Sequence, residues 1–267
     1  MFSKSTKKKI YHHKTKPKNK KELGTKKSLS AKPRISLIII SAFKENQQLK
    51  SPQIYLAPEE RVRKVIELLE KEYPNAKTAL NYTNPLEILV ATMLSAQTTD
   101  ERVNIVTKSL FKKYKTPEDY ANADIKELEQ DIRSTGFYHN KARNLKKCCQ
   151  LLVEKFHSQV PKTMPELLEL PGVARKTANI VLFNAYGIIS GIAVDTHVRR
   201  LSQRLGLTDQ DNPAKIEEEL IKITPKDKWM RLTDLLIFHG RQICIARKPK
   251  CEICVLNQIC PSAFTFG

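Results

Sequence analysis

The stretch LPGVARKTA, residues 170–178, has the form of a tight turn that leads directly into a helix. Gly172 permits the close backbone turn, and the first amide groups of the new helix have no partner within that helix. Such amides can hold a phosphate oxygen without reading a base sequence. The pattern alone also fits an ordinary helix joint, because many joints carry Pro-Gly.

The chain around this turn predicts an all-α protein. From about residue 57 onward apolar residues fall at helical spacing, and no run alternates with a period of two. Thr98 and Glu101 have the spacing of a capping box, which leaves Gln97 in a short connection between two helices. The expected helices cover residues 62–69, 85–97, 98–114, 125–133, 141–156, 164–168, 175–186, 196–205, 214–223 and 227–243.

Charge is unevenly distributed along the 267 residues. The formal net charge is +19, and residues 1–50 hold 15 Lys or Arg against only Glu22 and Glu45. This balance favours a polyanionic partner, although a plain solvated surface remains an alternative. The first 50 residues are expected to form a disordered basic arm, with an organelle-targeting peptide or a misassigned start codon as alternatives. The apolar run 35–43 is about half of the roughly 20 residues that a membrane-spanning helix needs, so no membrane contact is expected.

Four of the six cysteines lie in the last 24 residues as Cys244-x6-Cys251-x2-Cys254-x5-Cys260. Four thiols this close require two disulfides or a metal. A helical chain without a signal sequence suggests a reducing compartment, which argues against disulfides. The spacing alone leaves zinc and an iron–sulfur cluster equally open.

Asp195 stands between an apolar stretch and a helical run in the segment IAVDTHVRR, residues 192–200. Aspartate is a favoured helix N-cap, and that role alone explains the residue. A carboxylate that caps a helix at the edge of a cleft could also stabilise developing positive charge on a substrate. His197, two residues further on, could orient Asp195 or approach a phosphate, although such a histidine is more often structural.

These motifs together resemble the endonuclease III family of helix-hairpin-helix DNA glycosylases, over roughly residues 57–261. The resemblance implies a [4Fe-4S] cluster held by Cys244, Cys251, Cys254 and Cys260, with a structural role. It also implies that Arg247, Lys248 and Lys250, within the cysteine loop, meet DNA phosphate, although they could be ordinary exposed loop residues.

The same resemblance makes Lys176 the nucleophile and Asp195 the residue that assists base loss. Only a neutral amine can attack the sugar and form a Schiff base, and a lysine at this position implies a glycosylase that also cleaves the strand. Gly172, Val173, Arg175 and Thr177 are then the hairpin residues that contact DNA. The alternative for Lys176 is a lysine that only contacts phosphate. The stretch between Lys176 and Asp195, which includes residues 187–191, is one residue longer than the family pattern and bears on the geometry of the cleft.

A base within a duplex cannot be attacked in the stack, so the family extrudes the nucleotide and fills the space behind it. Gln97, in LSAQTTD, resembles the family's inserted glutamine, although it could be a polar helix-end residue. Phe137 stands where family members carry leucine and could act as an aromatic wedge. Tyr138 could line the base pocket or belong to the core.

The sequence therefore predicts a two-domain helix-hairpin-helix glycosylase fold. A six-helix domain covers residues 80–190, and an iron–sulfur cluster domain combines residues 51–79 with 191–267. The implied function is a bifunctional DNA glycosylase and AP lyase of base excision repair, which removes oxidised pyrimidines and cleaves at abasic sites. The alternatives are a mismatch or adenine glycosylase without lyase activity and a non-catalytic DNA-binding module. Damaged double-stranded DNA is the expected partner of a monomer in the cytoplasm, associated with the nucleoid.

Overall fold

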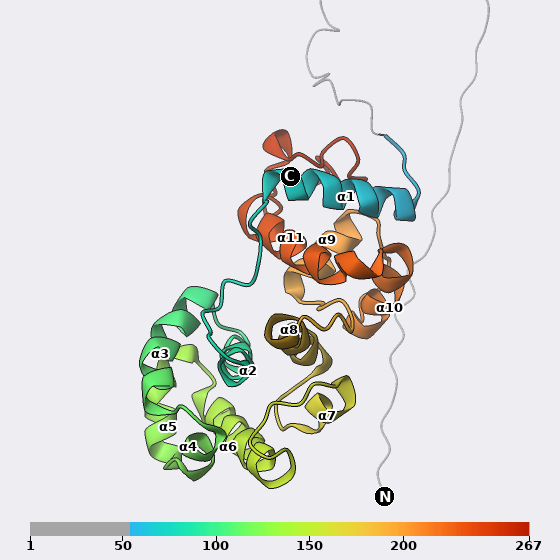
Figure 1. The fold of residues 1–267 in the computed structure, drawn as a ribbon. Helices are drawn as coiled ribbons and strands as arrows, with labels where there is room; N and C mark the ends of the chain where they lie inside the picture. Colours follow the sequence, from blue (N-terminus) through green and yellow to red (C-terminus); the bar gives the residue numbers. More distant parts are fainter. Residues whose placement is uncertain (1–53, 267) are drawn as a thin grey trace, which may run out of the picture. The chain divides into compact units, whose positions relative to one another are not determined.

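The computed structural model describes residues 54–266, and over that range the chain is helical without any strand (Figure 1). This confirms the predicted all-α class. The arm expected over residues 1–50 lies outside the described residues. The elements are α1 (Pro58–Glu72), α2 (Pro85–Leu94), α3 (Asp100–Lys113), α4 (Pro117–Asn122), α5 (Ile125–Asp131), η1 (Arg133–Thr135), α6 (Tyr138–Lys155), α7 (Met164–Glu169), α8 (Arg175–Tyr186), α9 (Thr196–Arg204), α10 (Pro213–Ile223), η2 (Lys226–Lys228), α11 (Trp229–Gln242) and η3 (Cys251–Ile253).

Side-chain caps fix where many of these helices begin. The side chain of Asn84 caps α2, that of Asp195 caps α9 and that of Asn212 caps α10. The expected cap of α3 was wrong by one residue. Thr99, rather than Thr98, accepts a hydrogen bond from the backbone of α3, and the Thr98 hydroxyl donates instead to the carbonyl of Thr135.

One helix, α4, was not expected from the sequence. Residues 85–186 hold seven α-helices rather than six, because Thr116 and Asp119 form a capping box around Pro117. A segment of six residues is too short to show helical periodicity, so the cap is its only local signal. Its Tyr120 is fully buried and stacks on Tyr114, with ring centroids 4.9 Å apart.

Two hydrophobic cores organise the described chain. The first is built by helices α2 to α8 and includes Ile88, Leu89, Leu145 and Leu182. Helix α2 lies within it almost wholly buried, with every residue from Leu86 to Val90 except Glu87 below 9% exposure. That burial explains the uniformly apolar sequence of this helix, because a helix covered on most sides needs no polar face.

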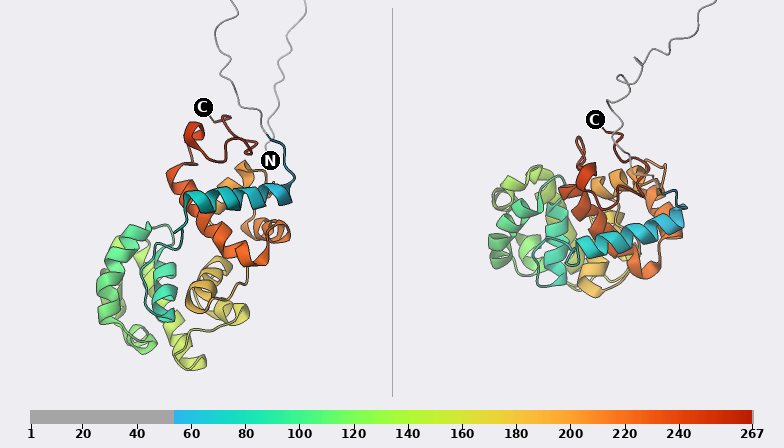
Figure 2. Two further views of the ribbon diagram at one scale, coloured as in Figure 1. Left: turned by 45° about the horizontal axis from the view of Figure 1, so that its top comes forward. Right: turned by 90° about the horizontal axis from the view of Figure 1, so that it is seen from above.

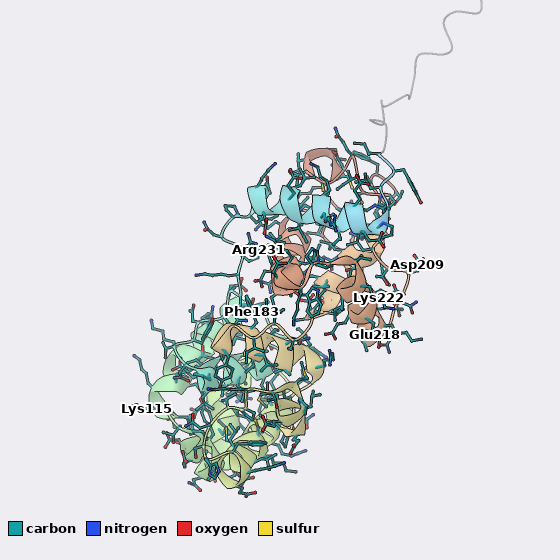
Figure 3. All side chains as sticks on the ribbon, turned by 45° about the vertical axis from the view of Figure 1, so that its right-hand side comes forward. Lys115, Phe183, Asp209, Glu218, Lys222 and Arg231 are labelled. Carbon is teal, nitrogen blue, oxygen red and sulfur yellow. The ribbon has the colours of Figure 1, made fainter. Side chains whose placement is uncertain are left out.

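The second core joins the start of the described chain to its end. Helix α1 packs against α11 and α10 (Figures 1 and 2), and Val62, Val65 and Leu69 pack into this core. Arg231 of α11, labelled in Figure 3, fastens the end of α1 by donating hydrogen bonds to the carbonyls of Tyr73 and Ala76. The two cores favour the expected division into domains, whose boundaries stay a prediction.

None of the helices between residues 54 and 266 combines the length and apolar composition needed to cross a bilayer.

Candidate active site and cluster site

The hairpin between α7 and α8 takes the tight form that residues 170–178 predicted. Gly172 has φ +83°, and a Cβ atom there would lie 3.0 Å from the Asn144 Cβ and 3.1 Å from the Met93 Cε. Only glycine meets both demands without strain. Val173 is buried and donates its amide to the carbonyl of Leu170 at 3.0 Å, which closes the turn.

The N-terminus of α8 is open to a ligand. Its N-cap residue, Ala174, has no side chain that could bond the first amides of the helix. Lys176 and Thr177 follow in the first turn, and both are partly exposed. Uncapped amides and the helix dipole together favour an anion at this end.

Arg175 is engaged within the protein. Its Nε donates to Oε2 of Glu217 in α10 at 2.7 Å, and Oε1 of this buried carboxylate accepts a hydrogen bond from Asn179 at 3.0 Å. The Ser190 hydroxyl in turn donates to Asn179. The guanidinium remains about half exposed, so a DNA contact by Arg175 stays a prediction.

Asp195 is the N-cap of α9. Its Oδ1 accepts hydrogen bonds from the amides of His197 and Val198, each at 2.8 Å. Within the described residues, Oδ2 has no hydrogen bond. The capping role leaves one carboxylate oxygen available to a substrate.

Lys176 and Asp195 line one pocket, although 18 residues separate them along the chain. Gln97, from the loop between α2 and α3, and His197, from α9, line the same pocket. Four residues singled out in the sequence thus meet around one cavity, despite the long 187–191 stretch. The pocket offers an amine and a carboxylate to the same bound molecule.

The surroundings of His197 favour the neutral form of its imidazole. Burial lowers its pKa, and the nearby charges of Arg200 and Arg241 act in the same direction, whereas Asp195 opposes the shift. Nη2 of Arg200 lies 3.2 Å from the His197 Nδ1, where the guanidinium can only donate. A neutral imidazole can accept that hydrogen bond, whereas a charged one cannot.

Three charged residues that the sequence did not single out also face this region. Asp100 and Arg241 form an ion pair, with 2.9 Å between Oδ2 and Nη2, and line the pocket. Asp234 of α11 lines an adjoining pocket that also contains Lys176 and Asp195. Burial raises the pKa of Asp234 to about 7. The one sequence signal for Asp234 is an acid within the apolar run of α11.

Gln97 and Phe137 stand on two loops that border another pocket, lined also by Gly172 of the hairpin. Both residues are exposed and have left-handed backbone conformations, with φ 54° and 48°. Tyr138 is placed differently, because its partly buried ring packs against the first core. Its neighbour His139 pairs with Glu129, with 2.7 Å between the Nδ1 and Oε2 atoms. A contact of Tyr138 with DNA stays a prediction.

The four C-terminal cysteines line one cavity beside His239 and Arg204. Arg204 donates to the Cys244 Sγ at 3.3 Å, and the His239 Nε2 lies 3.3 Å from the Cys254 Sγ. Between residues 54 and 266 no three His, Cys, Asp or Glu side chains are placed to hold one metal ion. Four thiols that line one cavity fit either a zinc ion or an iron–sulfur cluster. Arg247, Lys248 and Lys250 are exposed in the loop before Cys251.

Comparison with known proteins decides the family. A model described as the HhH-GPD superfamily of base excision DNA repair proteins matches residues 90–226, and one for the iron–sulfur binding domain of endonuclease III matches residues 244–260. Endonuclease III of Synechocystis sp. is 51% identical over 204 residues, which cover 76% of this chain and 93% of the relative. The chain belongs to the endonuclease III family. The enzyme of Escherichia coli K12, a more distant relative, is 38% identical over 73% of this chain and 92% of its own.

Solved structures of endonuclease III are similar to this chain over 79% of its length. A non-covalent endonuclease III–DNA complex matches with a TM-score of 0.76 and 45% identity, covering 79% of this chain and 98% of the other. A trapped endonuclease III–DNA covalent intermediate matches with a TM-score of 0.75 at the same identity, over 79% and 99%. As a member of this family the chain carries a [4Fe-4S] cluster, which resolves the choice between zinc and iron–sulfur.

Proposed function

We propose that Lys176 is the nucleophile and Asp195 the assisting carboxylate of this endonuclease III family enzyme. The chain is a bifunctional DNA glycosylase and AP lyase of base excision repair, and its partner is DNA. The observation that carries the residue assignment is the shared pocket, which Lys176 enters from the first turn of α8 and Asp195 from the N-cap of α9.

The chemistry follows from the two groups. The Lys176 amine attacks C1′ of the sugar, the bond from C1′ to the base breaks, and the base leaves with that electron pair and a proton. Opening of the sugar ring gives an imine between Lys176 and C1′. Loss of a proton from C2′ then expels the 3′ phosphate oxygen, and water hydrolyses the imine to return the amine. Asp195 stabilises the positive charge that develops on the sugar as the base departs.

DNA is bound by backbone amides of the protein and by positively charged side chains. The open N-terminus of α8, with Thr177 and the turn at Gly172 and Val173, fits a phosphate oxygen. Arg247, Lys248 and Lys250 add exposed positive charge beside the cluster. His197 lines the reaction pocket, and its backbone amide donates to Asp195, so its side chain is available to contact the bound DNA.

The cysteines Cys244, Cys251, Cys254 and Cys260 would hold the [4Fe-4S] cluster. Burial raises the pKa of the Cys254 thiol to about 12 and that of Cys260 to about 11, and binding of the cluster would favour their thiolate forms. When bound, the cluster would stabilise the conformation of the loop that carries the basic residues.

We further propose oxidised pyrimidines and abasic sites as the substrates, a monomer as the active form and the cytoplasm as its location. The family resemblance supports the substrates.

Borohydride trapping on a duplex with one abasic site tests the proposal. Reduction of the imine should yield a covalent protein–DNA adduct, and peptide mapping should place the adduct on Lys176. Lys176→Gln should give no adduct, whereas Lys222→Gln, an exposed lysine of α10, should match the parent. An adduct on another lysine would contradict the assignment of Lys176, whereas no adduct in the parent would favour a non-catalytic module.

A further inference from the structure

Two loops of the first core present strained tips to solvent. Gln97, between α2 and α3, has φ 54°, and Phe137, between η1 and α6, has φ 48°. A residue with a Cβ atom rarely adopts this conformation unless its surroundings hold it there. Phe137 is also 65% exposed, which is unusual for a large apolar ring. Both features indicate side chains kept ready for a partner.

A buried lysine lies between the bases of these loops. Lys141, in the first turn of α6, is only 8% exposed, and its Nζ donates to three oxygens at 2.8 Å each. One is the carbonyl of Leu94, where the Gln97 loop begins, and another is the hydroxyl of Thr98, where that loop ends. The third is the carbonyl of Thr135, just before the Phe137 loop. The ammonium thus has all three protons bonded, to acceptors from both loops.

Packing alone does not explain a charge at this position. An ammonium is costly to bury, and burial lowers the pKa of Lys141 to about 8. Its three acceptors are neutral, and the residues around it in the adjoining pocket (Met93, Ala96, Gln97, Phe137, Asn140, Asn144 and Gly172) carry no charge that would offset this cost. A methionine would fill the same space without that cost. Compared with a methionine, Lys141 adds hydrogen bonds that connect the two loops.

We propose that Lys141 is a positioning residue that fixes the Gln97 and Phe137 loops relative to each other, so that both side chains enter the duplex together when a nucleotide is extruded. The proposal rests on the proposed function, because it assigns the two tips to the space left by the extruded nucleotide. The Thr98 hydroxyl supports it, because it also donates to the Thr135 carbonyl and so bridges the loops directly.

The test compares substrates that do and do not require extrusion. Single-turnover cleavage is measured on an oxidised pyrimidine paired in a duplex and on the same lesion in single-stranded DNA. Lys141→Met should slow cleavage of the paired lesion at least tenfold and that of the single strand less than twofold. Lys146→Met is the matched control on the same helix, since the Lys146 Nζ donates to the carbonyl of Ala123, away from both loops.

A double-mutant cycle measures the coupling between Gln97 and Phe137. This coupling would not change if Lys141 only stabilised the fold. Gln97→Ala and Phe137→Ala should be non-additive on the paired lesion in the parent and additive in Lys141→Met. If Lys141→Met does not fold, Thr98→Val keeps the test possible, because Thr98 is partly exposed and its loss removes one acceptor and the direct bridge. Its effect should be smaller, with the same preference for paired DNA.

Equal slowing on both substrates, or none on either, would overturn the proposal, as would unchanged coupling between Gln97 and Phe137. Borohydride trapping of each variant on an abasic site separates this failure from failure of the proposed function. If the parent traps and Lys141→Met traps equally, the chemistry of Lys176 stands whatever the loops do.

Discussion

Arg175, the residue next to Lys176, is ion-paired with the buried carboxylate of Glu217, with 2.7 Å between its Nε and the Glu217 Oε2. Glu217 also accepts from Asn179 on the same face of α8. The start of the helix that carries Lys176 is thereby fastened to α10. The backbone at the candidate nucleophile therefore depends on a carboxylate that does not enter its pocket.

Removing that carboxylate should destabilise the protein and slow the reaction. Glu217→Ala leaves the buried amide of Asn179 without its acceptor and frees Arg175, at a cost of about 1–3 kcal/mol. Thermal unfolding and single-turnover cleavage measure the two effects. Glu218→Ala, an exposed neighbour labelled in Figure 3, should stay within about 0.5 kcal/mol of the parent. Equal stability of the two variants would show that the ion pair does not fasten α8.

Gly172→Ala should weaken both folding and DNA binding. The added Cβ meets Asn144 and Met93 at about 3 Å in a left-handed backbone, so a loss of about 1–3 kcal/mol is expected. Gly187→Ala is the matched control, because Gly187 has φ +68° but nothing within 4 Å of its added Cβ. That variant should lose only about 1 kcal/mol and retain its DNA affinity. The phosphate role of the hairpin fails if both variants bind DNA as the parent does.

Asp195 has two roles that substitution can separate. Asn is as good an N-cap as Asp, so Asp195→Asn should leave the melting temperature nearly unchanged while removing the charge. Cleavage should fall by about 10²-fold or more. Asp195→Ala loses the cap as well and should cost about 1 kcal/mol of stability. A fully active Asp195→Asn enzyme would leave the aspartate only its structural role.

Asp234 should make stability depend on pH. Burial raises its folded pKa from 3.8 to about 7, so between these values the folded state binds more protons than the unfolded chain. The contribution of Asp234 to stability is therefore lost as pH rises from about 4 to 7. Asp234→Asn should match the parent at pH 4 and be more stable at pH 8, by about 1–3 kcal/mol. Asp227→Asn, exposed nearby, should show no such difference. A gain that does not vary with pH would mean that Asp234 is already ionised in the folded protein.

The sequence predicted the helical class and the hairpin because those conclusions rest on short motifs with local causes, whereas the meeting of Lys176 with Asp195 was implied by the family resemblance. Apolar spacing gives helices, Gly172 gives the turn, and aspartate before a helix gives a cap. It missed α4, whose six residues are too few for periodicity. The role of Lys141 was missed as well. A sequence does not distinguish a buried lysine from an exposed one, and the three acceptors of Lys141 come from separate segments of the chain.

The same limit applies to Arg175 and Asp234. Arg175 was assigned to DNA from its place in the hairpin, and its partner Glu217 lies 42 residues away on α10. Only packing of the two helices reveals the pair. Asp234 stood as a single acid in an apolar run, and its raised pKa comes from burial that no local pattern reports.

In the proposed reaction the amine of Lys176 performs the attack on the sugar. Single-turnover cleavage of a duplex with one oxidised pyrimidine, by Lys176→Gln protein that is folded and retains the absorbance of its cluster, tests this most directly. We expect the rate to fall by several orders of magnitude while DNA affinity stays within a few-fold of the parent. Cleavage at the parental rate by that variant would rule out Lys176 as the nucleophile.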